Sequence, residues 1–407
     1  MFCSAIKLMR VIISGVKREN LLAYFLTYVG YMTLTISMTL TPSLASNLHL
    51  SDYVTQIAMS LSFFMFSVSA ILFATLSDVF TAKRVLLFSQ SLSIFGLVCI
   101  GLSDSIYTVY IGFVSLGLGT GCYSSIARAL ISRNADNNSQ MKKAYSVLSV
   151  MIIVAPIVST YLALLLIPIS WRAAYFCMAT IEVVLFIFSI KILTADAQRQ
   201  IVIPASKIFS GFAHALSQPR YLLNVMIVAI LFSFYLGVLM SSFKGLLVDE
   251  LNMSMDVFTI VFLVTSLLYI LGIFSYRIKA DSSHKKRYNL GILAIIFIFI
   301  ALYSFLEISS YSTVTTLHLI CYFLGFFIPM ATGAAMSNIT KGHGTAAAMI
   351  TFSVALCMSI WGFLKAHFNM SNYHFILLAL WISFSLALLL KIIIVFGIDR
   401  KKSEISN

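Results

Sequence analysis

Three of the few charged side chains in this chain stand together in a short break between two long apolar stretches. Asp78, Lys83 and Arg84 all lie within residues 76–84, with an apolar run on either side. A charge placed in hydrocarbon costs about 2.5–3.5 kcal/mol even on the mildest insertion scale, so we expect this break at a membrane surface. A carboxylate that pairs in only one of two conformations biases the equilibrium between them. We therefore predict a latch that includes Asp78, while a solvated loop explains Lys83 and Arg84 equally well.

Two other titratable side chains fall inside apolar runs, where the chemistry open to them is proton binding. Glu182 follows Trp171 by eleven residues, which places it about 16 Å into a helix at 1.5 Å per residue. His318 lies near one end of a later run and could titrate at physiological pH. An ionisable group inside a membrane is a functional candidate by default. We predict Glu182 and His318 as proton-coupling candidates, with a hydrogen-bonded packing role as the alternative for each.

The elements that carry these residues follow from composition. The chain is 60% hydrophobic and only 10% charged, whereas a soluble domain carries about 25% charged residues. Mean hydropathy is +0.99. Apolar runs of roughly 20 residues recur along the sequence, each long enough to cross a hydrocarbon core of about 30 Å. The sequence therefore predicts an all-α polytopic membrane protein.

We predict twelve transmembrane helices arranged as two six-helix bundles. The first bundle comprises residues 1–194, a central cytoplasmic loop comprises 195–219, and the second bundle with a short tail comprises 220–407. Two such halves are typical of transporters built from internal repeats. The expected spans are 21–44, 54–77, 84–103, 106–131, 143–167, 171–194, 220–246, 255–279, 288–308, 313–338, 345–366 and 372–397.

The basic residues predict the orientation in the membrane. With the N-terminus inside, the inner segments collect 24 of the 27 Lys and Arg residues. Cytoplasmic loops of membrane proteins carry such an excess. We expect a multi-pass protein of the cell membrane, the inner membrane in a bacterium, with both termini cytoplasmic.

Charge and motif content argue against other classes of protein. The net charge of +13 is spread over short loops and forms no soluble basic face, so we expect no nucleic-acid partner. The sequence has no phosphate-binding loop, metal-ligand spacing or catalytic triad pattern, so we expect neither a metal site nor an enzyme. The expected partners are a small-molecule substrate and the lipid bilayer, and the chain should function as a monomer.

The break after the second span resembles the characteristic loop of the major facilitator superfamily. Leu76, Ser77, Asp78 and Lys83 match that loop, while glycines and bases of the family pattern are replaced at Ala74, Val79, Thr81 and Ala82. The resemblance implies the major facilitator fold and alternating access. It also implies a gating role for Asp78, Lys83 and Arg84.

Three further segments resemble the drug:proton antiporters of the bicyclomycin and chloramphenicol-resistance (Bcr/CflA) type. They are 154–156 with Pro156, 170–176 with its Trp-Arg pair, and 344–348 at the eleventh span. The fourth span departs from the antiporter pattern, because Phe113 stands where a buried arginine is expected.

The resemblance implies a secondary transporter, most simply one that exports a small amphiphilic compound, either a drug or a secreted metabolite, against protons. Its energy source would be the proton gradient, with no cofactor. A solute importer of the same fold and a non-transporting membrane sensor remain alternatives.

The resemblance also implies that spans one, four, seven and ten line a central cavity. Aromatic side chains and methionines there suit an amphiphilic substrate, although ordinary helix packing explains any single one equally well. Pro42 and Pro156 are expected to bend their helices. The cavity candidates are Tyr31, Thr35, Met38, Tyr123, Arg128, Asn224, Tyr235, Tyr322 and Asn338.

Overall fold

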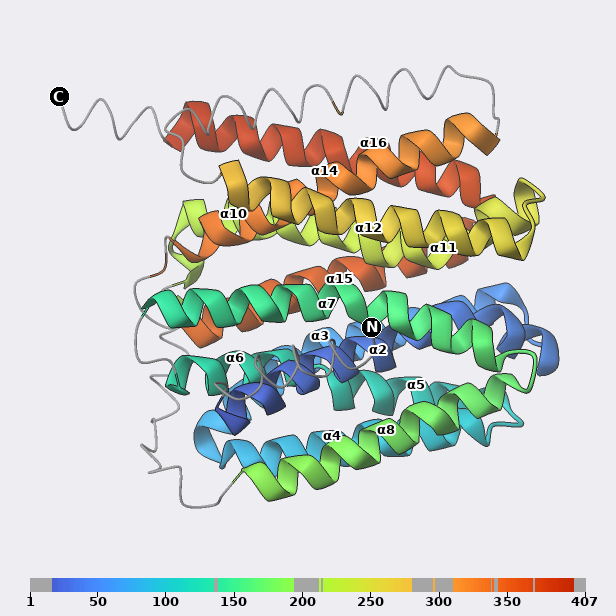
Figure 1. The fold of residues 1–407 in the computed structure, drawn as a ribbon, viewed down its shortest axis with the longest axis horizontal. Coiled ribbons are helices and arrows are strands. Elements are labelled where there is room, and N and C mark those ends of the chain that lie inside the picture. The colour runs from blue at the N-terminus through green and yellow to red at the C-terminus, as the bar shows by residue number, and fades with distance from the viewer. Residues whose placement is uncertain are drawn as a thin grey trace, which may run out of the picture. The chain divides into compact units, whose positions relative to one another are not determined.

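The computed structural model describes residues 17–134, 138–193, 212–213, 215–279, 296, 310–337, 339, 343–368 and 370–398. Every regular element in these ranges is a helix (Figure 1). Ten helical segments in these ranges are long and apolar enough to cross a membrane, and Val150–Leu166 is a shorter apolar helix. The elements are α2 (Arg18–Asn47), α3 (Asp52–Val79), α4 (Ala82–Gly101), α5 (Ile106–Thr120), α6 (Tyr123–Asn134), α7 (Asn138–Leu166), α8 (Trp171–Ile192), α10 (Pro219–Ser233), η2 (Phe234–Met240), α11 (Ser241–Lys244), η3 (Gly245–Glu250), α12 (Met255–Lys279), α14 (Ser310–Met336), α15 (His343–Phe368), α16 (Asn372–Ile392) and η4 (Ile393–Ile398).

The predicted spans correspond to these helices, with two refinements. The fourth span is divided at residues 121–122 into α5 and α6, and the seventh contains two π-helical stretches, η2 and η3. The ninth predicted span, 288–308, lies outside the described residues except for Ile296. Most of the predicted loop 195–219 also lies outside them, so the predicted domain boundaries stay a prediction.

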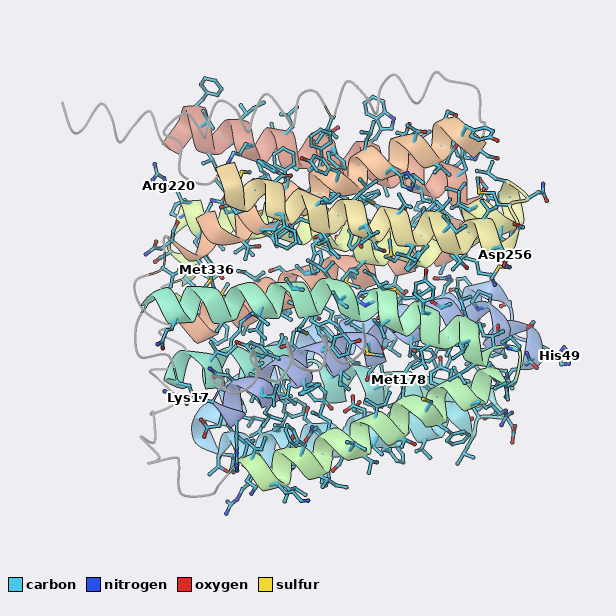
Figure 2. All side chains as sticks on the ribbon, in the orientation of Figure 1. Lys17, His49, Met178, Arg220, Asp256 and Met336 are labelled. Carbon is cyan, nitrogen blue, oxygen red and sulfur yellow. The ribbon has the colours of Figure 1, made fainter. Side chains whose placement is uncertain are left out.

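The chain forms two compact units. Unit 1 comprises Met1–Leu40 and Val68–Ile208, and unit 2 comprises Thr41–Ser67 and Phe209–Asn407. Within unit 2, Figure 2 places Arg220 and Met336 at one end and His49 and Asp256 at the opposite end. This is the alternation expected of helices that cross a membrane in turn.

In unit 1, α4 packs against both α5 and α8 (Figure 1). The contact between α4 and α5 depends on glycines. A Cβ added to Gly96 would lie 2.6 Å from the backbone nitrogen of Leu116, and one added to Gly119 would overlap the backbone of Ser93. Small residues let helix backbones approach closely in membranes, where packing rather than water exclusion drives association. As a result, α5 is held tightly along α4.

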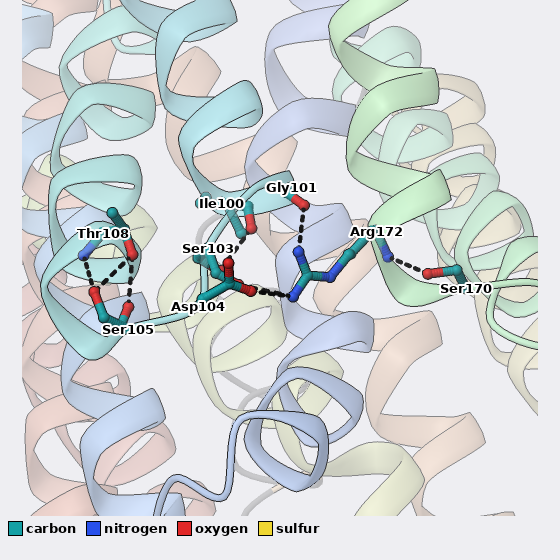
Figure 3. A network of polar contacts seen from close by, with 8 residues as sticks. All are labelled: Ile100, Gly101, Ser103, Asp104, Ser105, Thr108, Ser170 and Arg172. Atoms are coloured by element: carbon teal, nitrogen blue, oxygen red, sulfur yellow. Dashed lines mark hydrogen bonds and ion pairs between the residues drawn. The ribbon is translucent and has the colours of Figure 1, made fainter.

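Arg172 fixes the start of α8 against the end of α4 (Figure 3). Its guanidinium donates to the backbone oxygens of Gly101 at 3.4 Å and Ser103 at 3.0 Å, and it pairs with Asp104 at 2.8 Å. The carbonyl groups at a helix C-terminus have no partner within the helix and carry negative partial charge, so a cation stabilises them. Ser170 caps α8 at the same place by accepting from the Arg172 backbone N–H at 3.2 Å.

Lys83 makes the corresponding contact at the other end of the same helix pair. Its ammonium group donates to the backbone oxygen of Ile190, in the last turn of α8, at 3.0 Å. Thr81 caps α4 beside it by accepting from the backbone N–H of Arg84. The two antiparallel helices α4 and α8 are thus joined by a base at each end, which fixes their register.

In unit 2, α12 and α14 cross with backbone against backbone. A Cβ on Gly272 would overlap the backbone oxygen of Tyr322, and a Cβ on Gly325 would overlap that of Tyr269. The seventh span and α16 are joined by Glu250, whose carboxylate accepts from backbone N–H groups in the first turn of α16, including that of Tyr373 at 3.0 Å. An acid at a helix N-terminus compensates its positive end.

Candidate functional site

Glu182 lies in the middle of α8 and is completely buried. Met178, one turn earlier, is away from both ends of this helix in Figure 2. The clamps at Arg172 and Lys83 set the register of α8 against α4, and therefore the height at which Glu182 faces its neighbours. A buried carboxyl group needs hydrogen-bond partners, because losing water costs several kcal/mol when nothing replaces it.

Three hydroxyl groups from three helices supply those partners. Thr33 of α2 donates to Glu182 Oε1 at 2.9 Å, and Ser93 of α4 donates to the same oxygen at 3.1 Å. Tyr123, the first residue of α6, donates to Oε2 at 3.0 Å. Thr33, Ser93 and Tyr123 are each at most 1% exposed. We call Glu182 and these three residues the Glu182 cluster.

The chemistry of the Glu182 cluster differs from that of an ion pair. Among the described residues, no basic side chain forms a salt bridge with Glu182 or interacts with it electrostatically. A hydroxyl group can donate to a carboxylate and can also rotate to accept from a carboxylic acid, which a lysine or an arginine cannot do. The partners of Glu182 can therefore satisfy both its ionised and its protonated form.

Further polar contacts hold the helices around the cluster. Tyr175 of α8 donates to Ser37 of α2 at 3.3 Å. Gln90 of α4 donates to Ser189 of α8 at 3.1 Å. Both contacts are buried and lie on the two sides of Glu182 along α8, so α2 and α4 are fixed to α8 above and below the carboxyl group.

The sequence indicated Glu182 as a proton-coupling candidate and Tyr123 as a cavity candidate, and it did not indicate Thr33 or Ser93. It selected the face of the first span that carries Tyr31, Thr35 and Met38, whereas Thr33 faces α8. The available signal was the spacing of hydroxyl residues, since Thr33 and Ser37 lie four apart, as do Ser89 and Ser93. Residues four apart share one face of a helix.

The selected face of the first span is also buried. Tyr31 is 6% exposed and Met38 is 7% exposed. The hydroxyl of Thr35 donates to the Tyr31 backbone oxygen and lies 2.8 Å from that of Ser159 in α7. Arg128 of α6 is close enough to Tyr31 to interact with it electrostatically. These residues therefore join α2 to α7 and α6.

The predicted latch is described only in part. Asp78 lies in the last turn of α3, and its side chain is outside the described residues. Lys83 contacts the end of α8 as described above, and the backbone of Arg84 contributes to the cap of α4. The gating role of the three residues stays a prediction.

In unit 2, Tyr235 is buried within η2 and stacks on Tyr269 of α12, with ring centroids 4.3 Å apart. Asn224 is also buried; its amide donates to the backbone oxygen of Arg220 at 2.7 Å, and its Oδ1 atom has no hydrogen-bond partner among the described residues. An unpaired buried oxygen of this kind calls for an explanation, such as a water or a bound solute.

Two candidates on α14 face α12. His318 lies 3.4 Å from the backbone oxygen of Val261, and Tyr322 donates to Ser275 at 2.9 Å. Glu182 and His318 belong to different units. Asn338 lies outside the described residues. Pro42 lies inside α2 and Pro156 inside α7, and the bends predicted at these prolines stay a prediction.

The geometry of the described residues contains no group of three or more His, Cys, Asp or Glu side chains that could hold a metal ion. Its distinctive feature is a protonatable carboxyl group enclosed by hydroxyls inside a bundle of membrane-spanning helices. This arrangement is that of a polytopic membrane protein with a buried, hydrogen-bonded carboxyl group.

A comparison with protein families identifies the family to which the chain belongs. Residues 21–366 match the family model described as Major Facilitator Superfamily, and the chain belongs to that family of transporters. No curated protein sequence matches the chain.

Solved structures of similar fold are consistent with this assignment. One is a D-xylose–proton symporter, with a TM-score of 0.70 at 13% identity, covering 93% of this chain and 97% of the other. Another is a mutant form of the nucleoside transporter NupG, with a TM-score of 0.65 at 11% identity, covering 92% of this chain and 98% of the other. At these identities the likeness shows the major facilitator fold alone.

Proposed function

We propose that the chain is a proton-coupled secondary transporter of a small amphiphilic compound, with Glu182 as the group that binds the proton. The observation that carries this proposal is the Glu182 cluster, a completely buried carboxyl group with three O–H partners from three helices. In alternating access the proton would reach Glu182 from the side that is open and leave to the other side after the transition.

The membrane setting favours a proton carrier over a purely structural acid. An ionisable side chain inside a membrane is costly and is a functional candidate by default. Hydroxyl partners, which can donate to a carboxylate or accept from an acid, are compatible with reversible protonation. The fourth span carries Phe113 in place of a buried base, so on this proposal proton binding depends on the sixth span.

We propose export as the direction, in exchange for protons. The supporting observation is the resemblance of the segments around Pro156, Trp171 and Gly344 to drug:proton antiporters. Symport is the second candidate, favoured by the similarity in fold to a D-xylose–proton symporter. We also propose that the protein works as a monomer in the cell membrane with both termini in the cytoplasm, as the distribution of basic residues supports.

Flux in reconstituted liposomes with an imposed pH gradient tests the function. The panel should contain cationic and neutral amphiphiles together with D-xylose and nucleosides. If the protein is an exchanger, the transported compound should move in the direction opposite to protons. If it is a symporter, the compound should move in the same direction as protons. The Glu182→Gln variant should lose acceleration by the pH gradient, while Asp256→Asn, which changes an exposed acid of α12, should keep it. Equal stimulation of Glu182→Gln and the natural chain would refute the role of Glu182.

A further inference from the structure

The fourth span consists of a fixed part and a part that begins at the Glu182 cluster. The fixed part is α5, whose end is held on α4 by the close approach of Gly119 to Ser93 and by a hydrogen bond from Ser89 to the Gly119 backbone oxygen. The helix is then interrupted at residues 121–122. Tyr123 starts α6 directly after this break, so any rotation of α6 about the break acts first on Tyr123.

Tyr123 is enclosed between two helices. Its hydroxyl reaches Glu182 of α8, and its ring lies on Gly30 of α2. A Cβ added to Gly30 would come within 2.7 Å of the Tyr123 Cδ2 atom and within 3.3 Å of its Cβ and Cγ atoms. The phenol ring therefore occupies the space that a side chain at position 30 would fill, so α6 contacts α2 closely at this point.

The hydrogen bonds indicate where a proton adds to Glu182. The Oε1 atom accepts from both Thr33 and Ser93, whereas Oε2 accepts only from Tyr123. A carboxylate oxygen offers about two lone pairs, so the free one belongs to Oε2. Protonation at Oε2 turns that oxygen into a weaker acceptor and a donor, and the bond from Tyr123 must weaken or reverse.

We propose that Tyr123 is the positioning residue that couples the protonation state of Glu182 to the angle between α5 and α6. This inference rests on the proposed function of Glu182. Loss of the Tyr123–Glu182 bond leaves Ser93 of α4 as the polar partner of the Tyr123 hydroxyl and loosens α6 at the break. The same helix carries Arg128, which interacts with Tyr31 of the first span. Binding of one proton on α8 is thereby converted into a movement in the two spans of unit 1 that are expected to line the cavity.

Few other ionisable groups face this site. Cys122 is the second ionisable neighbour of Glu182 among the described residues, and its thiol donates to Ser89 at 2.9 Å. The helices α2 and α4 present only the hydroxyls of Thr33 and Ser93 to the carboxyl group. A response to pH at this site therefore belongs to Glu182 and Tyr123 together.

The distance between two spin labels, measured without a substrate, tests the inference. One label replaces Tyr107, which is 77% exposed at the start of α5, and the other replaces the half-buried Ala129 of α6. The full-length chain is used in lipid nanodiscs, with its cysteines replaced except the buried Cys122 and Cys321. The inference predicts a shift in this distance between acidic and alkaline pH.

Four variants separate the possible outcomes. Tyr123→Phe should lose the pH-dependent shift, and Gly30→Ala should lose it as well because the added methyl group displaces the ring. Glu182→Gln should keep the acidic distance at every pH. Tyr175→Phe makes the same chemical change on a tyrosine that bonds to Ser37 rather than to Glu182, so it should behave like the parent chain.

Each contrary result has a distinct meaning. A full shift in Tyr123→Phe together with none in Glu182→Gln overturns the role of Tyr123 and leaves the proton site intact. A full shift in Glu182→Gln overturns the proposed function itself. A parent chain whose distance does not respond to pH overturns the coupling to α6. Thermal unfolding of each variant in the same nanodiscs identifies a chain that has lost its fold, and Gly30→Ala then provides a second route to the same answer.

Discussion

The hydroxyl of Thr33 stabilises the ionised form of Glu182, and Thr33→Val removes this hydroxyl with almost no change in shape. The hydroxyl donates to Oε1 at 2.9 Å inside a completely buried site. A hydrogen bond to a charged group contributes about 1.5–3 kcal/mol, and about 1.4 kcal/mol corresponds to one pH unit. A hydrogen bond to the neutral acid contributes only about 0.5–1.5 kcal/mol, so loss of the hydroxyl should raise the titration midpoint of Glu182 by about 1 pH unit.

Infrared absorption of the protonated carboxyl group measures this midpoint directly, with Glu182→Gln identifying the band. Thr33→Ser keeps the hydroxyl and should titrate close to the natural chain. Thr27→Val makes the same substitution on α2 at a buried threonine that bonds only to the backbone oxygen of Ala23, and it should also leave the midpoint in place. A midpoint in Thr33→Val equal to that in Thr33→Ser would refute the assignment of Thr33 as a donor to Glu182.

Three further predictions concern the scaffold and are checked by thermal unfolding in detergent. Gly325→Ala should cost about 1–3 kcal/mol, because its Cβ would overlap the backbone of α12, whereas Gly333→Ala on the same helix should cost far less, since its nearest contact is at 3.6 Å. Glu250→Gln should lower stability by about 1 kcal/mol through loss of the charged cap on α16, and an unchanged midpoint would contradict that cap. Asp104→Asn should lower stability by less than about 1 kcal/mol because the Asp104 side chain is 84% exposed. Arg172→Gln should lower it more, because the backbone oxygens of Gly101 and Ser103 also lose their donor.

The spans were predictable because their signal is length and composition. A run of about 20 apolar residues has few structures open to it in a membrane. The division of the fourth span was not predictable, since Gly121 and Cys122 are both tolerated inside membrane helices. The π-helical stretch around Tyr235 was not predictable either, because its residues are ordinary apolar helix residues.

The acidic residue of the candidate site was predictable from the sequence, but most of its hydrogen-bond partners were not. Glu182 was conspicuous as the only acid in its span. A serine or threonine inside an apolar helix commonly bonds to a backbone oxygen of its own helix, as Thr27 does to Ala23. Thr33 donates to Glu182 on another helix, whereas the nearby Thr35 donates to the Tyr31 backbone oxygen of its own helix. The sequence does not distinguish these two threonines.

The proposed use of one buried carboxyl group as the proton carrier has an electrical consequence. A cycle that exchanges one proton on this carboxyl group for an uncharged solute moves one unit of charge across the bilayer. A membrane potential of 100 mV then contributes about 2.3 kcal/mol to each cycle. Exchange for a monovalent cation moves no net charge and gains nothing from the potential. The voltage dependence of flux therefore reports the charge of the transported compound before that compound is identified chemically.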